Sequence, residues 1–355
     1  MSCLTARTLI ALCGLLLTGA CIDSGGASGR TGVDVLEDSI DRTILPDLAA
    51  FTSATVAMQG EVASFCGSPE AGGLEGLQDT WKALALSWNT VAAYNLGPLD
   101  DDFIVPRIIF IESMRQRGTD YTDTVREELE RALVGDVPLD GAFFDGLTFT
   151  KVGLLALEVL VFESSVEGHP TSTADIVDDF VLAPRKCEYL QGVTDRLVST
   201  AREVDDGWRI DDGTGIPFRD QMLDEALPDG TEPIVALVLA LFDHLEYTKT
   251  RKLEGILDAQ LSGQFYPHMS VMLDAYERFL DQESDTAGLV DLMEERGFVA
   301  EADEVRTNLD AAQAAATAES REELAAAIGL VEGNLKREIP DSLGILLGIN
   351  FADGD

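Results

Sequence analysis

Apolar residues recur along most of this chain at every third or fourth position, a spacing that places them on one face of an α-helix. The clearest run lies between positions 74 and 91, and comparable runs lie at 190–208 and 324–339. The members of these runs are Leu74, Leu77, Trp81, Leu84, Trp88 and Val91, then Leu190, Val193, Leu197, Ala201, Val204 and Trp208, then Leu324, Ile328, Val331, Leu335 and Ile339. Alternation of the kind typical of strands is scarce. The pattern predicts an all-α protein made of helical bundles.

Two segments, 152–162 and 234–242, are almost wholly apolar, so each is predicted to lie at the centre of a bundle and not on its surface. Both are too short to span a bilayer. Residues 211–230 carry the heaviest turn composition in the middle of the chain, and they are the predicted junction between two domains. We therefore expect an N-terminal helical bundle over residues 33–210 and a C-terminal helical bundle over residues 231–355.

The N-terminus has the composition of a bacterial export signal, with Arg7 near the start, an apolar stretch over 9–17 and small residues up to Cys21. Residues 17–21 read Leu-Thr-Gly-Ala-Cys and resemble a bacterial lipobox, in which the cysteine is acylated after cleavage. On this interpretation residues 1–20 are a signal peptide, Cys21 carries a lipid, and the Gly- and Ser-rich residues 21–32 are a flexible tether. The alternative is an ordinary secretory signal beside an incidental cysteine.

A lipid anchor predicts that the protein lies in the cell envelope and that the membrane is its first partner. Ile22 follows the cysteine at the position where lipoproteins retained in an inner membrane usually carry Asp. The resemblance to lipoproteins therefore favours the periplasmic side of the outer membrane.

The chain is strongly acidic, with 25 Lys and Arg residues against 64 Asp and Glu residues and a formal net charge of −39. Nucleic-acid backbones and anionic lipid headgroups would both be repelled, so these classes of partner are excluded. Cations and basic partners remain. The alternative interpretation is a solvated acidic surface with no specific ligand.

The cysteines become easy to assign once the signal peptide is removed. Cys3 and Cys13 leave with it, Cys21 carries the lipid, and Cys66 and Cys187 remain. Two thiols in an oxidising compartment predict a disulfide, although two isolated buried thiols are the alternative.

Five segments, taken together and in order, resemble the imelysin-like family of bacterial envelope proteins, which includes iron-regulated lipoproteins and an assigned metallopeptidase family. The segments are 77–98 with its Gly-Pro ending, the Arg-containing 107–117, the apolar 153–162, the Arg/Cys/Tyr start 185–189 and the C-terminal ending 343–355. The resemblance covers nearly all of the mature chain and implies two helical bundles per chain.

The family's signature helix carries the motif Gly-x-His-x-x-Glu, in which the His and the Glu fall on one helix face and can meet one metal ion. Here the glycine and the glutamate are Gly153 and Glu158, but Leu155 replaces the histidine. Leucine has no lone pair to donate, and no His-Glu-x-x-His sequence exists in the chain. The departure argues against peptidase activity and against a zinc site.

A carboxylate inside an apolar helix must be neutral, hydrogen-bonded or paired with a cation. For Glu158 we favour a buried structural pair with Arg107, because the resemblance places both segments in the same bundle. The alternative is an oxygen-rich site for a hard cation, iron or calcium, formed by Glu158 with Asp79 and Glu112. The cofactor is otherwise unknown.

Three histidines complete the candidate ligands: His169, His244 and His268. His244 and Glu246 lie two residues apart, which separates them on a helix, so we expect surface or junction positions for both and not a ligand pair. His268 follows Tyr-Pro in what reads as a turn, where a solvated side chain is expected.

The leading prediction is a lipid-anchored, non-catalytic envelope protein associated with iron or other metal uptake, or with cation binding. The first alternative is a metallopeptidase of the imelysin type. The second is an envelope scaffold that binds a protein partner and no metal.

Overall fold

The computed structural model describes residues 29–100, 106–113, 118–164, 172–210, 216–224, 227–255, 258–281 and 287–347. Within these ranges the chain forms helices and no strand, so the all-α prediction is confirmed. The signal peptide, Cys21, His169 and the C-terminal ending from 348 onwards lie outside the described residues. None of the described helices has both the length and the apolar composition that crossing a bilayer requires.

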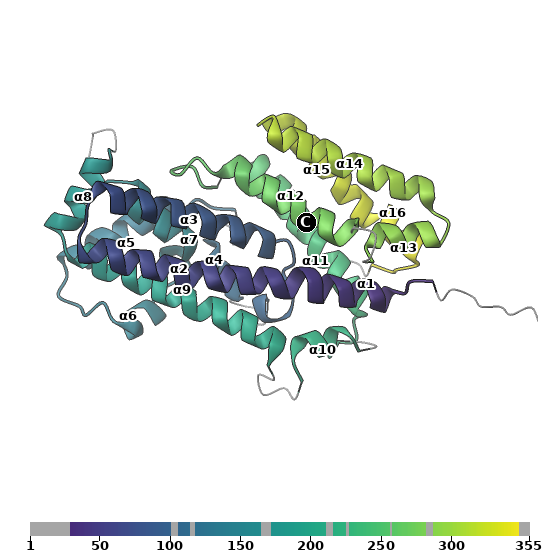
Figure 1. Cartoon of the computed structure of the whole chain (residues 1–355), viewed down its shortest axis with the longest axis horizontal. Helices are drawn as coiled ribbons and strands as arrows, with labels where there is room; N and C mark the ends of the chain where they lie inside the picture. Colours follow the sequence, from purple (N-terminus) through teal and green to yellow (C-terminus); the bar gives the residue numbers. More distant parts are fainter. Residues whose placement is uncertain are drawn as a thin grey trace, which may run out of the picture.

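The first group of helices is built around α2, α3 and α9, which run side by side (Figure 1), with α7 packed against α3 and α9. Its elements are α1 (Gly32–Asp38), the π-helix η1 (Ser39–Ile44), α2 (Leu45–Gly67), α3 (Ala71–Val91), the 3-10 helix η2 (Gly97–Leu99), α4 (Arg107–Ile111), α5 (Thr122–Val134), α6 (Gly141–Asp145), the 3-10 helix η4 (Phe149–Lys151), α7 (Gly153–Phe162), α8 (Thr173–Leu182) and α9 (Arg185–Arg209).

The second group is built around α11, α12, α14 and α15. Its elements are α11 (Pro233–Tyr247), the π-helix η5 (Thr248–Leu253), α12 (Phe265–Leu280), α13 (Leu289–Glu295), α14 (Val299–Thr317), α15 (Arg321–Lys336) and α16 (Glu338–Leu343). The short helix α10 (Phe218–Met222) contacts α9 and lies within the predicted junction.

The two groups share an interface and a continuous apolar core. Helix α12 packs against α3, and α1 contacts α11 and α13. The division into two domains at residues 211–230 stays a prediction, because these contacts join the groups whether or not each could fold alone.

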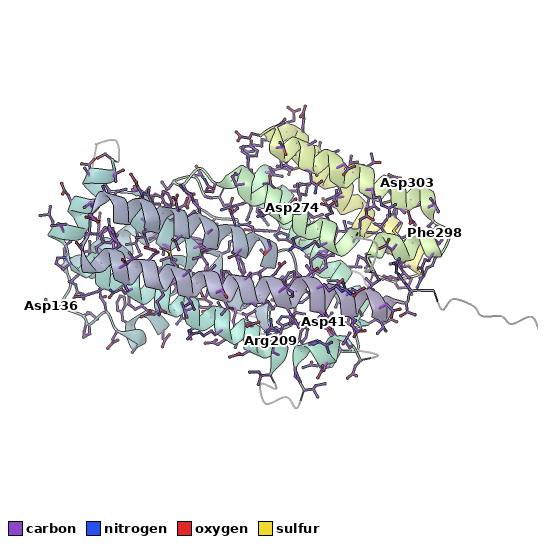
Figure 2. The ribbon with its side chains drawn as sticks, viewed as in Figure 1. Asp41, Asp136, Arg209, Asp274, Phe298 and Asp303 are labelled. Atoms are coloured by element: carbon purple, nitrogen blue, oxygen red, sulfur yellow. A yellow bond between two sulfur atoms is a disulfide. The ribbon has the colours of Figure 1, made fainter. Side chains whose placement is uncertain are left out.

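The predicted apolar stripes are confirmed, since every member of the three runs is buried. The first stripe lies on α3 and the second on α9, while the third runs along α15 and ends on α16. The apolar segments become α7 and α11, both largely buried. Acidic side chains such as Asp136, Asp274 and Asp303 are exposed (Figure 2), which places negative charge on the surface.

Two local features stabilise helix ends in the first group of helices. Cys66 near the end of α2 and Cys187 in the first turn of α9 form the predicted disulfide, with the sulfur atoms 2.13 Å apart. Thr31 caps α1, where its side chain and that of Asp34 form a reciprocal capping box. Regular structure therefore begins inside the tether predicted for residues 21–32.

Candidate functional site

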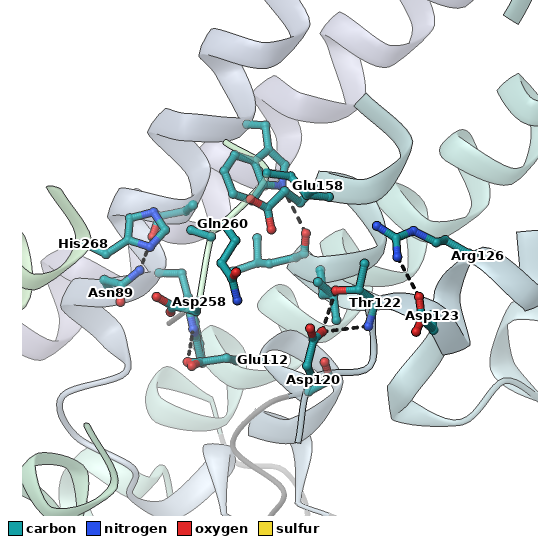
Figure 3. A pocket seen from close by; sticks show the side chains of 18 residues that line it. Asn89, Glu112, Asp120, Thr122, Asp123, Arg126, Glu158, Asp258, Gln260 and His268 are labelled. Carbon is teal, nitrogen blue, oxygen red and sulfur yellow. Dashed lines mark hydrogen bonds and ion pairs between the residues drawn. The ribbon is translucent and has the colours of Figure 1, made fainter. Parts of the chain in front are cut away.

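A cavity of about 240 Å³ lies where the two groups of helices meet (Figure 3). Its walls come from α3, α5 and α7 on one side and from residues 258–261 and α12 on the other. Its polar and aromatic lining includes Trp81, Trp88, Glu112, Ser113, Asp120, Asp123, Arg126, Glu158, Asp258 and His268. Leu155, which stands at the histidine position of the family motif, also lines it. Both signature positions therefore face one polar cavity.

The motif glycine is needed to start α7 in the right place. Gly153 has a φ of +76°, and a Cβ atom there would lie 2.5 Å from the carbonyl oxygens of Phe110 and Ile111. Only glycine permits both the left-handed backbone and this close approach to α4. The approach sets the position of α7, and with it the position of Glu158.

Glu158 is buried and is held by a hydroxyl and an amide, not by a cation. Its Oε1 accepts hydrogen bonds from the backbone N–H of Ser262 at 2.9 Å and from the Ser262 hydroxyl at 2.7 Å. Burial raises the pKa of Glu158 to about 7, although the two bonds from Ser262 oppose this rise. The carboxyl group therefore changes its charge near neutral pH.

The predicted pair between Arg107 and Glu158 is wrong. The Arg107 guanidinium lies 3.2 Å from the Glu203 carboxylate and donates to the carbonyl oxygen of Pro98. Arg107 begins α4, and its side chain runs towards α9 instead of into the cavity. Glu158 needs no arginine because Ser262 supplies two donors to its carboxyl group.

The pH dependence of stability tests this environment. The folded chain keeps the Glu158 proton up to pH ~7, whereas an unfolded chain releases it near the ordinary pKa of 4.5. Raising the pH through this window therefore lowers the free energy of unfolding, by about 3 kcal/mol at ~1.4 kcal/mol per pH unit. Glu158→Gln should remove this fall. Urea unfolding at several pH values measures it, and parallel curves for the two proteins would contradict the assignment.

A buried lysine organises the opposite wall. Lys252 in η5 has its Nζ 2.6 Å from Glu112 Oε1 and 2.7 Å from Asp258 Oδ2. Glu112 also accepts from Trp88 Nε1 at 2.9 Å and from the Tyr247 hydroxyl at 2.8 Å. Burial alone would lower the pKa of Lys252, but the two carboxylates outweigh it and the pKa lies above its ordinary value. Lys252 is thus a permanent cation that binds both carboxylates.

The predicted hard-cation set of Asp79, Glu112 and Glu158 is also wrong as a set. The Asp79 side chain is 76% exposed and pairs with Lys82 on the surface of α3. Glu112 is committed to three donors. In the part of the chain that the structure describes, no three His, Cys, Asp or Glu side chains are grouped so that they could hold a metal ion. The residues present therefore do not fit the metal that the family motif implies.

The positions predicted for His244 and His268 differ from those observed. His268 lies in the first turn of α12, where the preceding proline is tolerated, and it is 3% exposed. Burial lowers its pKa, so the imidazole is neutral at pH 7. His244 is buried on α11, with Nδ1 3.0 Å from the Tyr276 hydroxyl. A Tyr-Pro pair reads as a turn in sequence, but here it starts a helix.

Four buried polar atoms of the cavity-lining residues lack a hydrogen-bond partner in the described chain. They are Ser113 Oγ, Asp258 Oδ1, His268 Nδ1 and His268 Nε2. Buried polar groups are seldom left unpaired, since each unmade hydrogen bond costs about 1–3 kcal/mol. All four atoms belong to residues that line this one cavity.

Ser113, Asp258 and His268 are also the residue types of a hydrolytic triad. In a triad the serine hydroxyl is hydrogen-bonded to the imidazole, which is oriented by the carboxylate. Among the described residues, neither ring nitrogen of His268 is hydrogen-bonded, and neither is Ser113 Oγ or Asp258 Oδ1. The three side chains therefore form no proton relay among the described residues.

Comparison with known proteins gives a consistent picture. A family model described as Imelysin matches residues 44–338, most of the chain. The solved structure of an imelysin-like protein from Psychrobacter arcticum 273-4 is similar, with a TM-score of 0.69 and 16% identity over 90% of this chain and 97% of that one. So is a protein described as a "putative iron-regulated protein A precursor" from Parabacteroides distasonis ATCC 8503, with a TM-score of 0.64 and 16% identity over 90% and 96% of the two chains. No curated protein matches.

Proposed function

The chain belongs to the imelysin family, and from that premise we propose that it is a lipid-anchored, non-catalytic protein of the cell envelope that binds a cation in the cavity beside Glu158. The observation that carries the proposal is the group of unpaired polar atoms on Ser113, Asp258 and His268 around this cavity. In a cavity that was only a gap in the packing, such unpaired polar atoms would be unfavourable. The acidic lining favours a positively charged ligand.

The non-catalytic part rests on the motif helix. Leu155 supplies no metal ligand at the histidine position of the motif, so the metal that would activate a water for peptide hydrolysis lacks its imidazole. A peptidase function predicts chelator-sensitive cleavage of an unfolded protein, abolished by Glu158→Gln. We expect no such cleavage with any ion of a panel of divalent metals. Cleavage that the variant loses would overturn the proposal.

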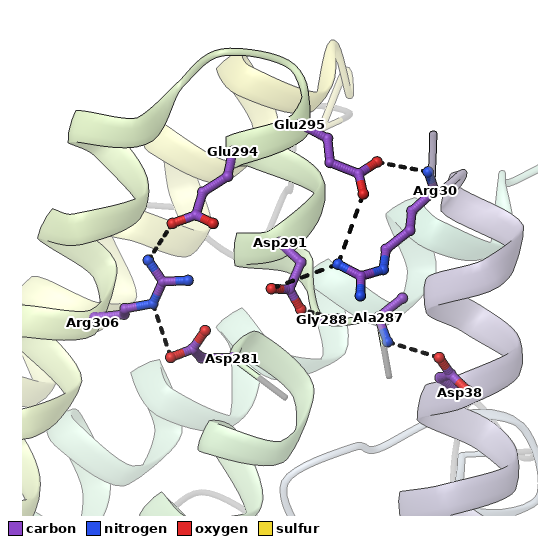
Figure 4. Close-up of polar contacts among 9 residues, drawn as sticks. All are labelled: Arg30, Asp38, Asp281, Ala287, Gly288, Asp291, Glu294, Glu295 and Arg306. Carbon is purple, nitrogen blue, oxygen red and sulfur yellow. Dashed lines mark hydrogen bonds and ion pairs between the residues drawn. The ribbon is translucent and has the colours of Figure 1, made fainter. Parts of the chain in front are cut away.

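The anchor fits the way the described chain begins. Arg30 lies against α13, where its backbone N–H donates to Glu295 at 2.6 Å and its guanidinium lies 3.9 Å from Asp291 (Figure 4). These contacts hold the start of α1 at the end of the molecule opposite α8 (Figure 1). A lipid on Cys21 would therefore tether the protein by this end. Replacing Cys21 by Ser should release the protein from membranes, as measured by fractionation.

Cation binding is tested by equilibrium dialysis of the full-length protein against calcium, ferric iron and alkylammonium ions. We expect at least one of these cations to bind at one saturable site per chain, with an affinity that Glu158→Gln lowers about tenfold, a loss of ~1.4 kcal/mol. Asp79→Asn is the matched control, because it removes one exposed carboxylate that does not line the cavity. Equal losses in both variants would show binding by the acidic surface in general and would overturn the proposal.

The association with iron uptake has one support, the description of the Parabacteroides protein as iron-regulated. We include it in the proposal as the setting in which the protein acts. Induction of the protein under iron limitation, measured by immunoblot, is the expected result. A constant level would remove iron from the proposal and leave cation binding untouched.

A further inference from the structure

The charge of the cavity lining selects the sign of the ligand. Five lining residues carry carboxyl groups, and Arg126 is the cation among the described lining residues. Arg126 is occupied, since its guanidinium lies 2.6 Å from Asp123 and 2.9 Å from Glu163. Lys252 compensates part of the charge on Glu112 and Asp258 from behind the wall. The excess of negative charge attracts a cation and repels an anion.

The aromatic walls select a cation with an apolar surface. The indole N–H of Trp81 donates to the Leu154 carbonyl oxygen at 3.2 Å, and that of Trp88 donates to Glu112 at 2.9 Å. Both donors are therefore used, and the rings offer a ligand their carbon surface. Indole is the side chain that attracts cations best through its π-face. A bare metal ion in its water shell would gain nothing from these walls or from Leu155.

Three of the four unpaired atoms can accept a hydrogen bond from a ligand: Ser113 Oγ, Asp258 Oδ1 and one nitrogen of the neutral His268 ring. Asp258 Oδ1 can only accept while ionised, and a neutral imidazole offers one accepting nitrogen. Ammonium N–H groups supply such donors. The volume of about 240 Å³ exceeds the ~150 Å³ of an engineered cavity that takes up benzene, so a molecule of several non-hydrogen atoms fits.

We infer that the cavity binds a small organic cation, an alkylammonium whose nitrogen lies between Glu158 and Asp258 and whose carbon substituents pack against Trp81, Trp88 and Leu155. This inference names the class of cation and rests on the proposed cation binding, although it does not depend on the association with iron. Carboxylates and indole rings together recognise both the charge and the apolar part of such a molecule.

Calorimetric titration of the full-length protein with three probes tests the inference. Butylammonium has N–H donors, choline has a quaternary charge, and 3,3-dimethylbutan-1-ol has the shape of choline without the charge. We expect each cation to bind about tenfold more tightly than the alcohol, a difference of ~1.4 kcal/mol. Equal affinity of choline and the alcohol would overturn the inference.

Two variants locate the site. Asp258→Asn should weaken butylammonium binding about tenfold while the control Asp79→Asn leaves it unchanged. Trp81→Phe keeps a ring in the wall and guards against misfolding of a larger change, and it should weaken choline binding about threefold because phenyl attracts cations less than indole. Thermal unfolding shows whether each variant is folded.

The outcomes separate the two proposals. Saturable, Glu158-dependent binding of calcium or ferric iron that choline does not displace would overturn the organic ligand and leave cation binding standing. Absence of binding for every cation would overturn both. Binding of the alcohol as tightly as the ammonium probes would show a neutral polar ligand and would also overturn both.

Discussion

Lys252→Met is expected to destabilise the protein by about 3–5 kcal/mol, because it leaves the buried Glu112 and the partly buried Asp258 without their cation. The Lys252 side chain is 1% exposed and binds Glu112 at 2.6 Å and Asp258 at 2.7 Å. Methionine fills a similar volume, so the loss reports charge and not a cavity. Urea unfolding followed by circular dichroism measures the change in the free energy of unfolding.

The matched control is Lys82→Met. Lys82 pairs with Asp79 on the surface, and exposed pairs of this kind contribute about 0–1 kcal/mol. Adding Glu112→Gln and Asp258→Asn to Lys252→Met removes the uncompensated charges and should restore part of the stability. A loss below about 1 kcal/mol for Lys252→Met would show that water reaches the two carboxylates and that the wall is not dry.

Removal of the disulfide by Cys66→Ala with Cys187→Ala should lower the free energy of unfolding by about 2–5 kcal/mol. The bond closes a segment of 121 residues, and in the chain-entropy account long loops are the ones whose closure restricts the unfolded chain most. The change acts on the unfolded state, so the native helices α2 and α9 should keep their packing. Urea unfolding under non-reducing conditions gives the difference.

Reduction of the natural protein supplies the control for that experiment. A thiol reductant should shift the unfolding midpoint of the natural protein towards that of the double variant and leave the variant unchanged. A midpoint of the natural protein that reductant does not move would show that the Cys66–Cys187 bond does not restrict the unfolded chain.

Much of the fold could be predicted because the spacing of apolar residues within a short segment is enough to indicate a helix. The apolar spacing on α3, α9 and α15 predicts the buried face of each helix from one short stretch of sequence. The burial of α7 and α11 is predicted because neither segment has a polar face. The prediction of where a helix begins was wrong where the local sequence fits two structures. The Tyr-Pro pair before His268 reads equally well as a turn or as the first turn of a helix.

The site could be predicted only in part, because its partners lie far apart in the chain. The sequence predicts that Glu158 is a buried acid that needs a partner, but the predicted partner, an arginine, is wrong. The observed partner, Ser262, lies 104 residues later in the chain, and nothing in the sequence around it indicates this role. Lys252 and Asp258 were missed for the same reason, since an isolated lysine looks like a surface residue until its carboxylates are placed. These groups meet only in the tertiary structure, where the two groups of helices pack together, as α12 does against α3.

The joint between the two groups of helices also constrains how such a chain can be shortened or recombined. A fragment ending at residue 210 would retain Glu158. It would lose the Ser262 hydroxyl that donates to Glu158, the imidazole of His268 and the buried ammonium group of Lys252. A fragment beginning at residue 231 would keep those groups with neither indole opposite them. Gene fusion or domain exchange that cuts between the halves would therefore leave each half with only part of the cavity lining.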